Sequence, residues 1–223
     1  MKKSRYFYLI ITAMLAVVLM GCATEDSQKL EVEQTVAART PYTGLRSNIA
    51  VGRFENKSGF MQGIFSDGVD RLGNQAKDEL ISHLQQTNRF VVLDRDNMEM
   101  ARQEAEFRGE TQDILGASYV ITGSVSEFGR KEVSTMAALG MLGRSKKQIA
   151  YSKVTLNVVD IRTTAVVYTS QGAGEYSLTD TEVMGWGTST GYDSTLNGKV
   201  LDLAIREAVD KLCDGIDAGA WTP

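Results

Sequence analysis

The chain contains 223 residues with 24 basic and 28 acidic side chains, which gives a formal net charge of −4 at pH 7. This length predicts one domain, or one domain with a tail, and an acidic chain without a basic stripe is not expected to bind nucleic acid. A single histidine and two cysteines are too few for a usual metal centre, and the sequence shows no catalytic constellation. We therefore expect no metal, no cofactor and no enzymatic activity.

The N-terminal residues have the organisation of a cleaved export signal. Three basic residues stand among the first five, an apolar run covers residues 8–20, and the small residue Gly21 precedes Cys22. With Leu19 three places before Cys22, the pattern resembles the signal of bacterial lipoproteins. The resemblance implies cleavage after Gly21 and acylation of Cys22, and an ordinary signal peptide with a chance cysteine is the alternative. Residue 23, directly after Cys22, is alanine. In the bacterial sorting rule, the absence of an aspartate at this position implies the outer membrane.

The mature chain would have 202 residues and a net charge of −7, because residues 1–21 hold three basic residues and no acidic one. An acylated N-terminus would anchor it to outer-membrane lipid, with the domain in the periplasm. Residues 22–45 are polar and without clear periodicity, which predicts a tether, and residues 46–223 are the predicted domain. Only Cys213 would remain as a free thiol, so an intramolecular disulfide is impossible. The sequence has no second apolar run of about 18 residues.

The first predicted elements of the domain are a strand, a loop and an amphipathic helix. Residues 49–54 alternate as in a strand with one buried face, and residues 55–65 are predicted to form a loop. Asp67 and Asp70 suit a helix N-terminus, where carboxylates meet unpaired backbone N–H groups. The apolar stripe of this helix is Val69, Leu72, Ala76, Leu80 and Leu84.

The remaining elements complete an α/β pattern. Asp96 and Glu99 resemble a capping box at the start of a second helix, which Gly109 ends. A long amphipathic helix with an apolar stripe from Leu201 to Cys213 closes the chain. Further strands are predicted over residues 90–93, 119–125, 153–161 and 165–170. The order β, α, β, α, β, β, β, α predicts an α/β fold in which helices pack on a small mixed sheet.

Two stretches have no place in this pattern. Residues 127–152 are much longer than a hairpin turn requires, and residues 172–198 separate the last strand from the last helix. Long insertions of this kind are usually functional or disordered.

The side chains with potential reactivity have structural explanations. His83 is expected to be a partly exposed residue beside the apolar stripe of the first helix. Cys213 is expected to be buried and inert, and Asp94 and Asp96 are expected to act as caps. These assignments favour a non-enzymatic protein.

Four segments carry a resemblance to the CsgG/HfaB family of curli production assembly/transport lipoproteins. They are residues 88–95, 117–124, 154–160 and 214–221, and they occur in the order of the family's elements. The resemblance implies an outer-membrane lipoprotein whose periplasmic α/β domain forms a homo-oligomeric ring. Each subunit would lend two β-hairpins to a shared transmembrane barrel that secretes unfolded polypeptide. The exported polypeptide and a periplasmic accessory protein are the partners that this role implies.

The two unassigned stretches stand where the family places its hairpins, which predicts hairpins over residues 129–153 and 172–195. The first stretch alternates with a period of two, as a strand between lipid and lumen requires. The second has charged residues on its apolar face and scattered glycines, so a soluble loop is its alternative. The residues expected to face lipid are Val133, Ala137, Leu139, Met141, Ile149 and Tyr151.

The loop over residues 55–67 aligns with the pore-narrowing loop of the family. Gly63 or Ile64 falls where the family has a tyrosine, and Asp67 falls where it has an asparagine, so the constriction is not reproduced residue for residue. Phe60 and Phe65 either substitute for it or anchor the loop in the core.

Two functions from different classes therefore follow from the sequence. The first is a subunit of a secretion channel of the curli assembly/transport type. The alternative is a lipid-tethered periplasmic adaptor or activator lipoprotein of similar fold without a pore.

Overall fold

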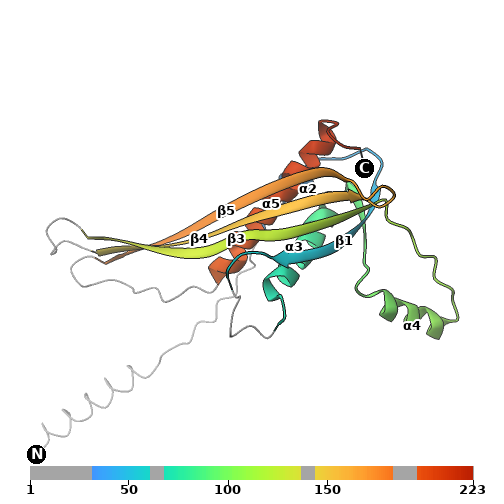
Figure 1. Cartoon of the computed structure of the whole chain (residues 1–223), viewed down its shortest axis with the longest axis horizontal. Helices are drawn as coiled ribbons and strands as arrows, with labels where there is room; N and C mark the ends of the chain where they lie inside the picture. The colour runs from blue at the N-terminus through green and yellow to red at the C-terminus, as the bar shows by residue number, and fades with distance from the viewer. Residues whose placement is uncertain (1–31, 61–67, 137–143, 183–194, 223) are drawn as a thin grey trace, which may run out of the picture. The chain divides into compact units, whose positions relative to one another are not determined.

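The structure of this chain is a computed structural model that describes residues 32–60, 68–136, 144–182 and 195–222. The chain divides into two units, residues 1–33 and 34–223, and the second contains every helix and strand described. These elements are α2 (Val36–Arg39), β1 (Ser47–Asn56), α3 (Arg71–Gln86), β2 (Phe90–Leu93), α4 (Met98–Arg108), β3 (Tyr119–Met136), β4 (Arg144–Asp160), β5 (Val166–Glu182) and α5 (Thr195–Asp217) (Figure 1).

The five strands form one mixed sheet in the order β2-β1-β3-β4-β5. β1 is parallel to both β2 and β3, whereas β3, β4 and β5 are antiparallel to one another. Parallel neighbours need long crossover connections, and α3 and α4 lie in those connections. The predicted α/β class, with helices packed on a small mixed sheet, is confirmed.

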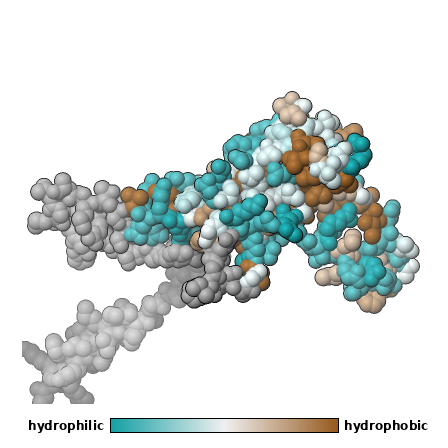
Figure 2. Space-filling view, in the orientation of Figure 1, coloured by the Kyte–Doolittle hydropathy of each residue, from teal (hydrophilic) through white to brown (hydrophobic). Residues whose placement is uncertain are grey.

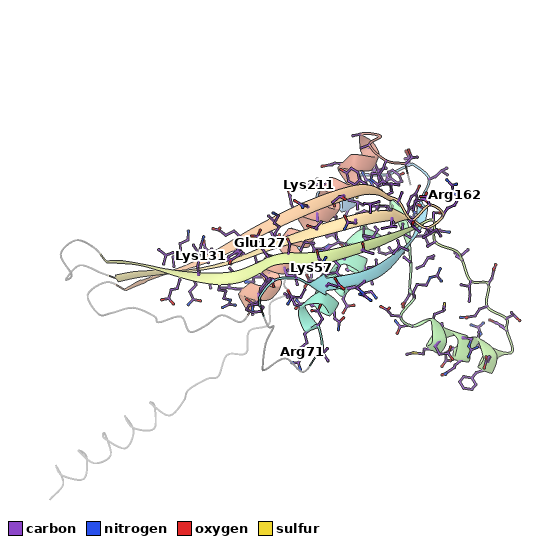
Figure 3. The ribbon with its side chains drawn as sticks, viewed as in Figure 1. Lys57, Arg71, Glu127, Lys131, Arg162 and Lys211 are labelled. Carbon is purple, nitrogen blue, oxygen red and sulfur yellow. The ribbon has the colours of Figure 1, made fainter. Side chains whose placement is uncertain are left out.

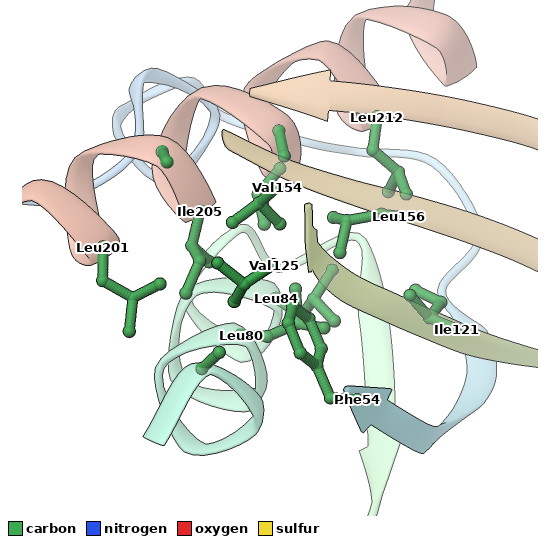
Figure 4. Close-up of a cluster of buried hydrophobic side chains, with 14 of the residues drawn as sticks. Phe54, Leu80, Leu84, Ile121, Val125, Val154, Leu156, Leu201, Ile205 and Leu212 are labelled. Atoms are coloured by element: carbon green, nitrogen blue, oxygen red, sulfur yellow. The ribbon is translucent and has the colours of Figure 1, made fainter. Parts of the chain in front are cut away.

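The core lies between one face of the sheet and the two helices α3 and α5 (Figure 4). Val125 on β3 and Leu156 on β4 point toward Leu84 on α3 and Ile205 on α5, and all four side chains are buried. The predicted stripe of the last helix is confirmed, since Leu201, Ile205, Val209 and Cys213 are all buried. The stripe of α3 is buried at Leu72, Ala76, Leu80 and Leu84.

The start of α3 confirms one predicted cap and corrects one predicted core residue. Asp70 is the N-cap, and its Oδ1 accepts a hydrogen bond from the Gly73 backbone N–H at 2.7 Å. Its Oδ2 accepts from the Asn56 N–H, also at 2.7 Å, which ties the helix to the end of β1. Val69 precedes this cap and is 55% exposed, so its predicted place in the stripe is wrong because the helix begins after it.

The start of α4 differs from the predicted capping box. Asn97 is the N-cap and makes no side-chain cap hydrogen bond. The Asp94 carboxylate accepts from the backbone N–H groups of Asp96 and Asn97, and Asp96 instead pairs with Lys77 of α3. Local bonding to Asp94 therefore replaces the box. Gly109 ends the helix as predicted, in the left-handed conformation with φ 69°.

The packed domain begins earlier than residue 46, the boundary expected from the sequence. The two carboxylate oxygens of Asp210 on α5 accept hydrogen bonds from the N–H groups of Val36 and Ala37, at 3.1 and 2.8 Å. The buried Arg89 donates to the Ala37 carbonyl at 3.1 Å and to Asp217 at 2.6 Å. The second half of the expected tether is thus held to α5, because these charged side chains satisfy its backbone groups.

The C-terminal tail closes the end of the sheet where β2 and β3 begin. Trp221 is buried, with its ring centroid 6.3 Å from that of Phe90, 5.6 Å from that of Tyr119 and 6.1 Å from that of Tyr168. Its indole N–H donates to the Leu212 carbonyl at 3.3 Å. The tail therefore connects three strands to the last helix.

Candidate functional site

In the two stretches without a role in the sequence pattern, the described residues 127–136, 144–152 and 172–182 are continuations of β3, β4 and β5. Antiparallel pairing of β3 with β4 runs from Tyr119 opposite Asp160 to Met136 opposite Arg144. β5 accompanies β4 as far as Glu182 opposite Arg144. We call residues 126–136, 144–153 and 172–182 the ribbon. It extends past the helices at the left of Figure 1.

The ribbon accounts for the arms of the first predicted hairpin and for one arm of the second. Residues 129–136 pair with residues 144–151 in continuous register, and the turn between them lies outside the described residues. In the second stretch, residues 172–182 form a strand against β4. Residues 183–194, where a return arm is expected, also lie outside the described part.

The two faces of the ribbon have different surroundings. Opposed residues of an antiparallel pair project to the same side of the sheet. Ser152 and Gly174, which are opposite each other, are buried on the side of α5. Gly129, Lys131 and Val133 project to the other side, which we call the open face because no helix described here covers it.

α5 supports the root of the ribbon through two glycines of β5. A Cβ atom on Gly174 would lie 2.9 Å from the Val200 carbonyl oxygen, and one on Gly172 would collide with the backbone of Ala204 and Ala208. Only glycine allows helix and strand to approach this closely. Sequence reasoning missed this role, although two glycines on the same face of a strand are a recognisable signal.

Two polar contacts join the ribbon to the first turns of α5. Arg130 Nε donates to the Asn197 side-chain oxygen at 2.8 Å. The Lys199 ammonium lies 5.3 Å from the centroid of the Tyr176 ring, within the range of a cation–π interaction. Together with the glycine contacts, they fix the direction in which the ribbon leaves the domain.

Three of the residues expected to face lipid are described, and all three lie on the open face. Val133 is 46% exposed, Tyr151 is 36% exposed, and Ile149 is buried between neighbouring strands. Lys147 is opposite Val133, and Lys131, which is labelled in Figure 3, is opposite Ile149, so lysines alternate with these apolar residues. The other three expected residues, Ala137, Leu139 and Met141, lie outside the described part of the chain.

The loop expected to narrow a pore is fixed at both of its described ends. Asn56 Nδ2 donates to the Phe60 carbonyl at 2.7 Å, and its Oδ1 accepts from the Ser58 hydroxyl at 2.6 Å. The Phe60 ring packs against the core, 4.6 Å from the ring of Phe128 at the root of the ribbon. Asp70 ties the other end to β1. Four expected loop residues lie outside the described ranges: Gly63, Ile64, Phe65 and Asp67.

The predicted anchor residues Gly21 and Cys22 also lie outside the described residues. Within the part of the chain that is described, no helix is long and apolar enough to cross a membrane.

The reactive side chains occupy buried positions. His83 is only 3% exposed, so the expected partial exposure is wrong: its Nε2 lies 2.7 Å from Asp202 Oδ1 on α5. Cys213 is free and buried as predicted, and burial raises the pKa of its thiol to about 12. A thiol with that pKa forms almost no thiolate at neutral pH, which makes it unreactive. Among the described residues no cluster of three or more His, Cys, Asp or Glu side chains could hold a metal ion.

Comparison with known proteins identifies the family of this chain. The family described as "Curli production assembly/transport component CsgG" matches residues 29–223. The chain belongs to the CsgG family. A Neisseria meningitidis serogroup B (strain ATCC BAA-335 / MC58) protein named "Putative lipoprotein NMB1126/NMB1164" is 55% identical to this CsgG-family chain over 214 residues, 96% of each chain. The family resemblance carried by the four sequence segments is therefore confirmed.

Two solved structures have weaker similarity to this CsgG-family chain. A PelC dodecamer from Paraburkholderia phytofirmans is 16% identical with a TM-score of 0.36, over 76% of this chain and 91% of that chain. Lipoprotein GNA1162 from Neisseria meningitidis is 13% identical with a TM-score of 0.36, over 78% of this chain and 99% of that chain. Similarity at this level shows neither the oligomeric state nor the function of this chain.

Proposed function

We propose that this CsgG-family protein is a lipid-anchored subunit of a ring-shaped secretion channel in the outer membrane, which exports unfolded polypeptide and catalyses no reaction. The observation that carries the proposal is the ribbon. Three strands of 18, 17 and 17 residues remain paired beyond the start of α5. A tilted strand of a membrane barrel needs about 9–11 residues, so the ribbon and the residues at its end are long enough to supply it.

Strand direction supports a four-stranded contribution from each subunit. β3 and β5 both run away from the domain, and β4 returns toward it. A ring that joined β5 of one subunit to β3 of the next would have parallel seams, whereas outer-membrane barrels are antiparallel throughout. We therefore propose that residues 183–194 return as a fourth strand. Open strand edges are costly in hydrocarbon, so the hairpins would enter the membrane only in a closed ring.

The composition of the open face suggests where hydrocarbon would begin. Lys131 and Lys147, beside Val133 and Ile149, are typical of the interfacial level, where lysine places its charge in water and its stem on apolar surface. Figure 2 shows mainly hydrophilic residues along the ribbon and hydrophobic ones next to its described end. The hydrocarbon-facing residues proposed from the sequence, at positions 137, 139 and 141, follow that end.

The loop between β1 and α3 is proposed to narrow the channel. Its two ends are held by Phe60, against the root of the ribbon, and by Asp70, against β1. A loop fixed at this place would project residues 61–67 beside the entrance of a ring formed by the ribbons. Gly63, Ile64, Phe65 and Asp67 are the proposed lining residues.

The lipid anchor gives the first test. Cys22→Ser should abolish acylation, because serine has no thiol to accept the diacylglyceryl group, and should shift the protein from the outer-membrane fraction to the soluble or unprocessed fraction. The measurement is fractionation after a high-salt wash, with Cys213→Ser as the matched cysteine control, which should stay membrane-bound. If the Cys22→Ser protein remains in the membrane fraction, acylation is not the anchor.

Conductance across a planar bilayer tests the channel itself. Leu139→Arg, at a proposed lipid-facing position near the midplane, should cost about 2–4 kcal/mol per subunit and prevent insertion. Ser134→Arg alternates with Val133 in the strand, so it should face the lumen, insert normally and change single-channel conductance. A pore-free adaptor would tolerate both changes, and well-folded wild-type oligomer without any conductance steps would refute the channel.

A further inference from the structure

Four polar side chains surround Ile149 on the open face of the ribbon. Ile149 is buried, and it is opposite Lys131 on β3 and Ser177 on β5. Lys147 and Tyr151 stand two residues before and after it on β4, and they project to the same side because side chains alternate along a strand. The centre of this group is therefore apolar, and hydrogen-bond donors lie around it.

The ring of Tyr151 lies across the neighbouring strand β3. A Cβ atom on Gly129, the residue opposite Tyr151, would lie 2.6 Å from the phenol oxygen, so the ring rests on bare backbone. Only glycine leaves this space. The hydroxyl group is thereby placed over β3, two residues before Lys131, and within the described part of the chain no side-chain hydrogen bond engages it.

Two lysines of the open face have no anion to balance their charge. Lys131 and Lys147 are diagonal neighbours on adjacent strands, a relation that places Cβ atoms about 7 Å apart. Lys153 on the same face pairs with Glu127 at 3.7 Å, but no described carboxylate forms an ion pair with Lys131 or Lys147. Like charges this close repel each other. An anion bound between the two ammonium groups would remove the repulsion.

The order of residues along the open face favours a lipid over a free anion. Glu127 and Glu175, the described carboxylates of this face of the ribbon, lie on the side of the domain. Val133, which is 46% exposed and opposite Lys147, lies on the side of the described end. Glu127 and Lys131 can be followed in this order along the ribbon in Figure 3. Carboxylates, ammonium groups and apolar surface thus follow one another outward, as water, phosphate and acyl chains do in a phospholipid leaflet.

We propose that the open face of the ribbon binds the phosphate group of a net-negative phospholipid between Lys131 and Lys147, above Ile149. The inference rests on the proposed function, in which the end of the ribbon enters the membrane. The two ammonium groups and the Tyr151 hydroxyl donate to the phosphate oxygens, and the acyl chains pass over Val133 toward the end of the ribbon. A zwitterionic choline headgroup is disfavoured, because its own cation would lie beside two lysines.

Lipid retention in detergent tests the site without a bilayer. Mature, acylated protein is purified in a non-ionic detergent, and native mass spectrometry counts the noncovalent lipids retained during titration with phosphatidylglycerol or phosphatidylcholine. The wild type should bind phosphatidylglycerol more tightly. One lysine beside anionic headgroups contributes about fivefold to affinity. Lys131→Gln and Lys147→Gln should therefore each lower the affinity for phosphatidylglycerol about fivefold, and the double variant should lower it about 25-fold.

Lys153→Gln is the matched control, because it removes the same charge from the same face but from a lysine that is paired with Glu127. It should bind phosphatidylglycerol as the wild type does. Equal affinity of the wild type for the two lipids, or equal losses in Lys153→Gln and Lys131→Gln, would overturn the proposal. Inorganic phosphate should not displace the lipid, because it has no acyl chains to contact the ribbon. Displacement would mean that the site binds a free anion and that the assignment to a lipid is wrong.

The lipid measurement and the planar-bilayer measurement fail separately. Protein that prefers phosphatidylglycerol but never conducts would refute the channel and support the lipid site. Protein that conducts but retains both lipids equally would refute the lipid site and support the channel.

Discussion

Replacing Gly172 with valine should lift the middle of α5 from β5 and lower the free energy of unfolding by about 3 kcal/mol. The reason is geometric: a side chain at this position would collide with the backbone of Ala204 and Ala208, and backbone atoms of a helix cannot move aside singly. For a domain of this size each kcal/mol corresponds to about 2–4 °C in Tm. Thermal unfolding followed by circular dichroism would therefore show a fall of about 6–12 °C.

The neighbouring residue provides the control for this substitution. Ala173 projects from the opposite, open face of the same strand and is exposed. Ala173→Val adds the same β-branched side chain, which suits an exposed strand position, and should leave Tm nearly unchanged. Equal losses of Tm in the two variants would mean that strand propensity, rather than the contact with α5, determines the effect.

Truncating Trp221 to alanine should cost about 3–5 kcal/mol, the range found for buried aromatic residues. The indole contacts rings from three strands and donates a hydrogen bond to the Leu212 carbonyl. Its loss leaves a cavity beneath the end of the sheet and removes the hydrogen bond that ties the tail to α5. The C-terminal tail should then be held less firmly against the domain, and denaturant unfolding should report a lower midpoint with an unchanged slope.

Phe107→Ala is the control for the tryptophan. Phe107 lies on α4 and is 82% exposed, so removal of its ring should change the free energy of unfolding by less than about 0.5 kcal/mol. A loss of stability comparable to that of Trp221→Ala would show that α4 packs against a partner in solution.

Elements governed by local pattern were the ones that could be predicted from the sequence. The stripes of α3 and α5 repeat every three or four residues, and their burial follows from that period alone. The short apolar run over residues 90–93 is bounded by polar residues and therefore predicts β2. The N-cap at Asp70 and the helix end at Gly109 depend on neighbouring residues in the sequence, so they too could be predicted.

The features that were missed depend on residues far apart in the sequence. His83 is buried because Asp202, 119 positions later, offers it a hydrogen bond, and no helical pattern contains that information. The closeness of Gly172 to α5 depends on the register between a strand and a helix. The alternation predicts the hairpin arms, but it does not show that they continue β3, β4 and β5 without a break, because that depends on the pairing between strands.

The early start of the domain has the same explanation. Residues 34–45 have no apolar period, so they were expected to be part of a tether. Their backbone is instead held by Asp210 and Arg89, two side chains that come from distant elements. Every residue type except proline offers the same backbone groups for hydrogen bonds. The sequence of the held segment therefore does not reveal them.

The helix α4 does not depend on the core of the domain for its stability. It has 11 residues and none of them is buried, a length at which an isolated helix is marginal in water. Its connections are tied to each other by Arg95, which donates to the Leu115 carbonyl at 2.7 Å, and to β1 by the bond from the Ser118 N–H to the Asn48 carbonyl at 2.7 Å. α4 can therefore unwind while the sheet remains intact, and its amides should exchange at the cost of local opening alone. The crossover is thus a part of the chain that can be lengthened, cut or replaced with little penalty to the rest.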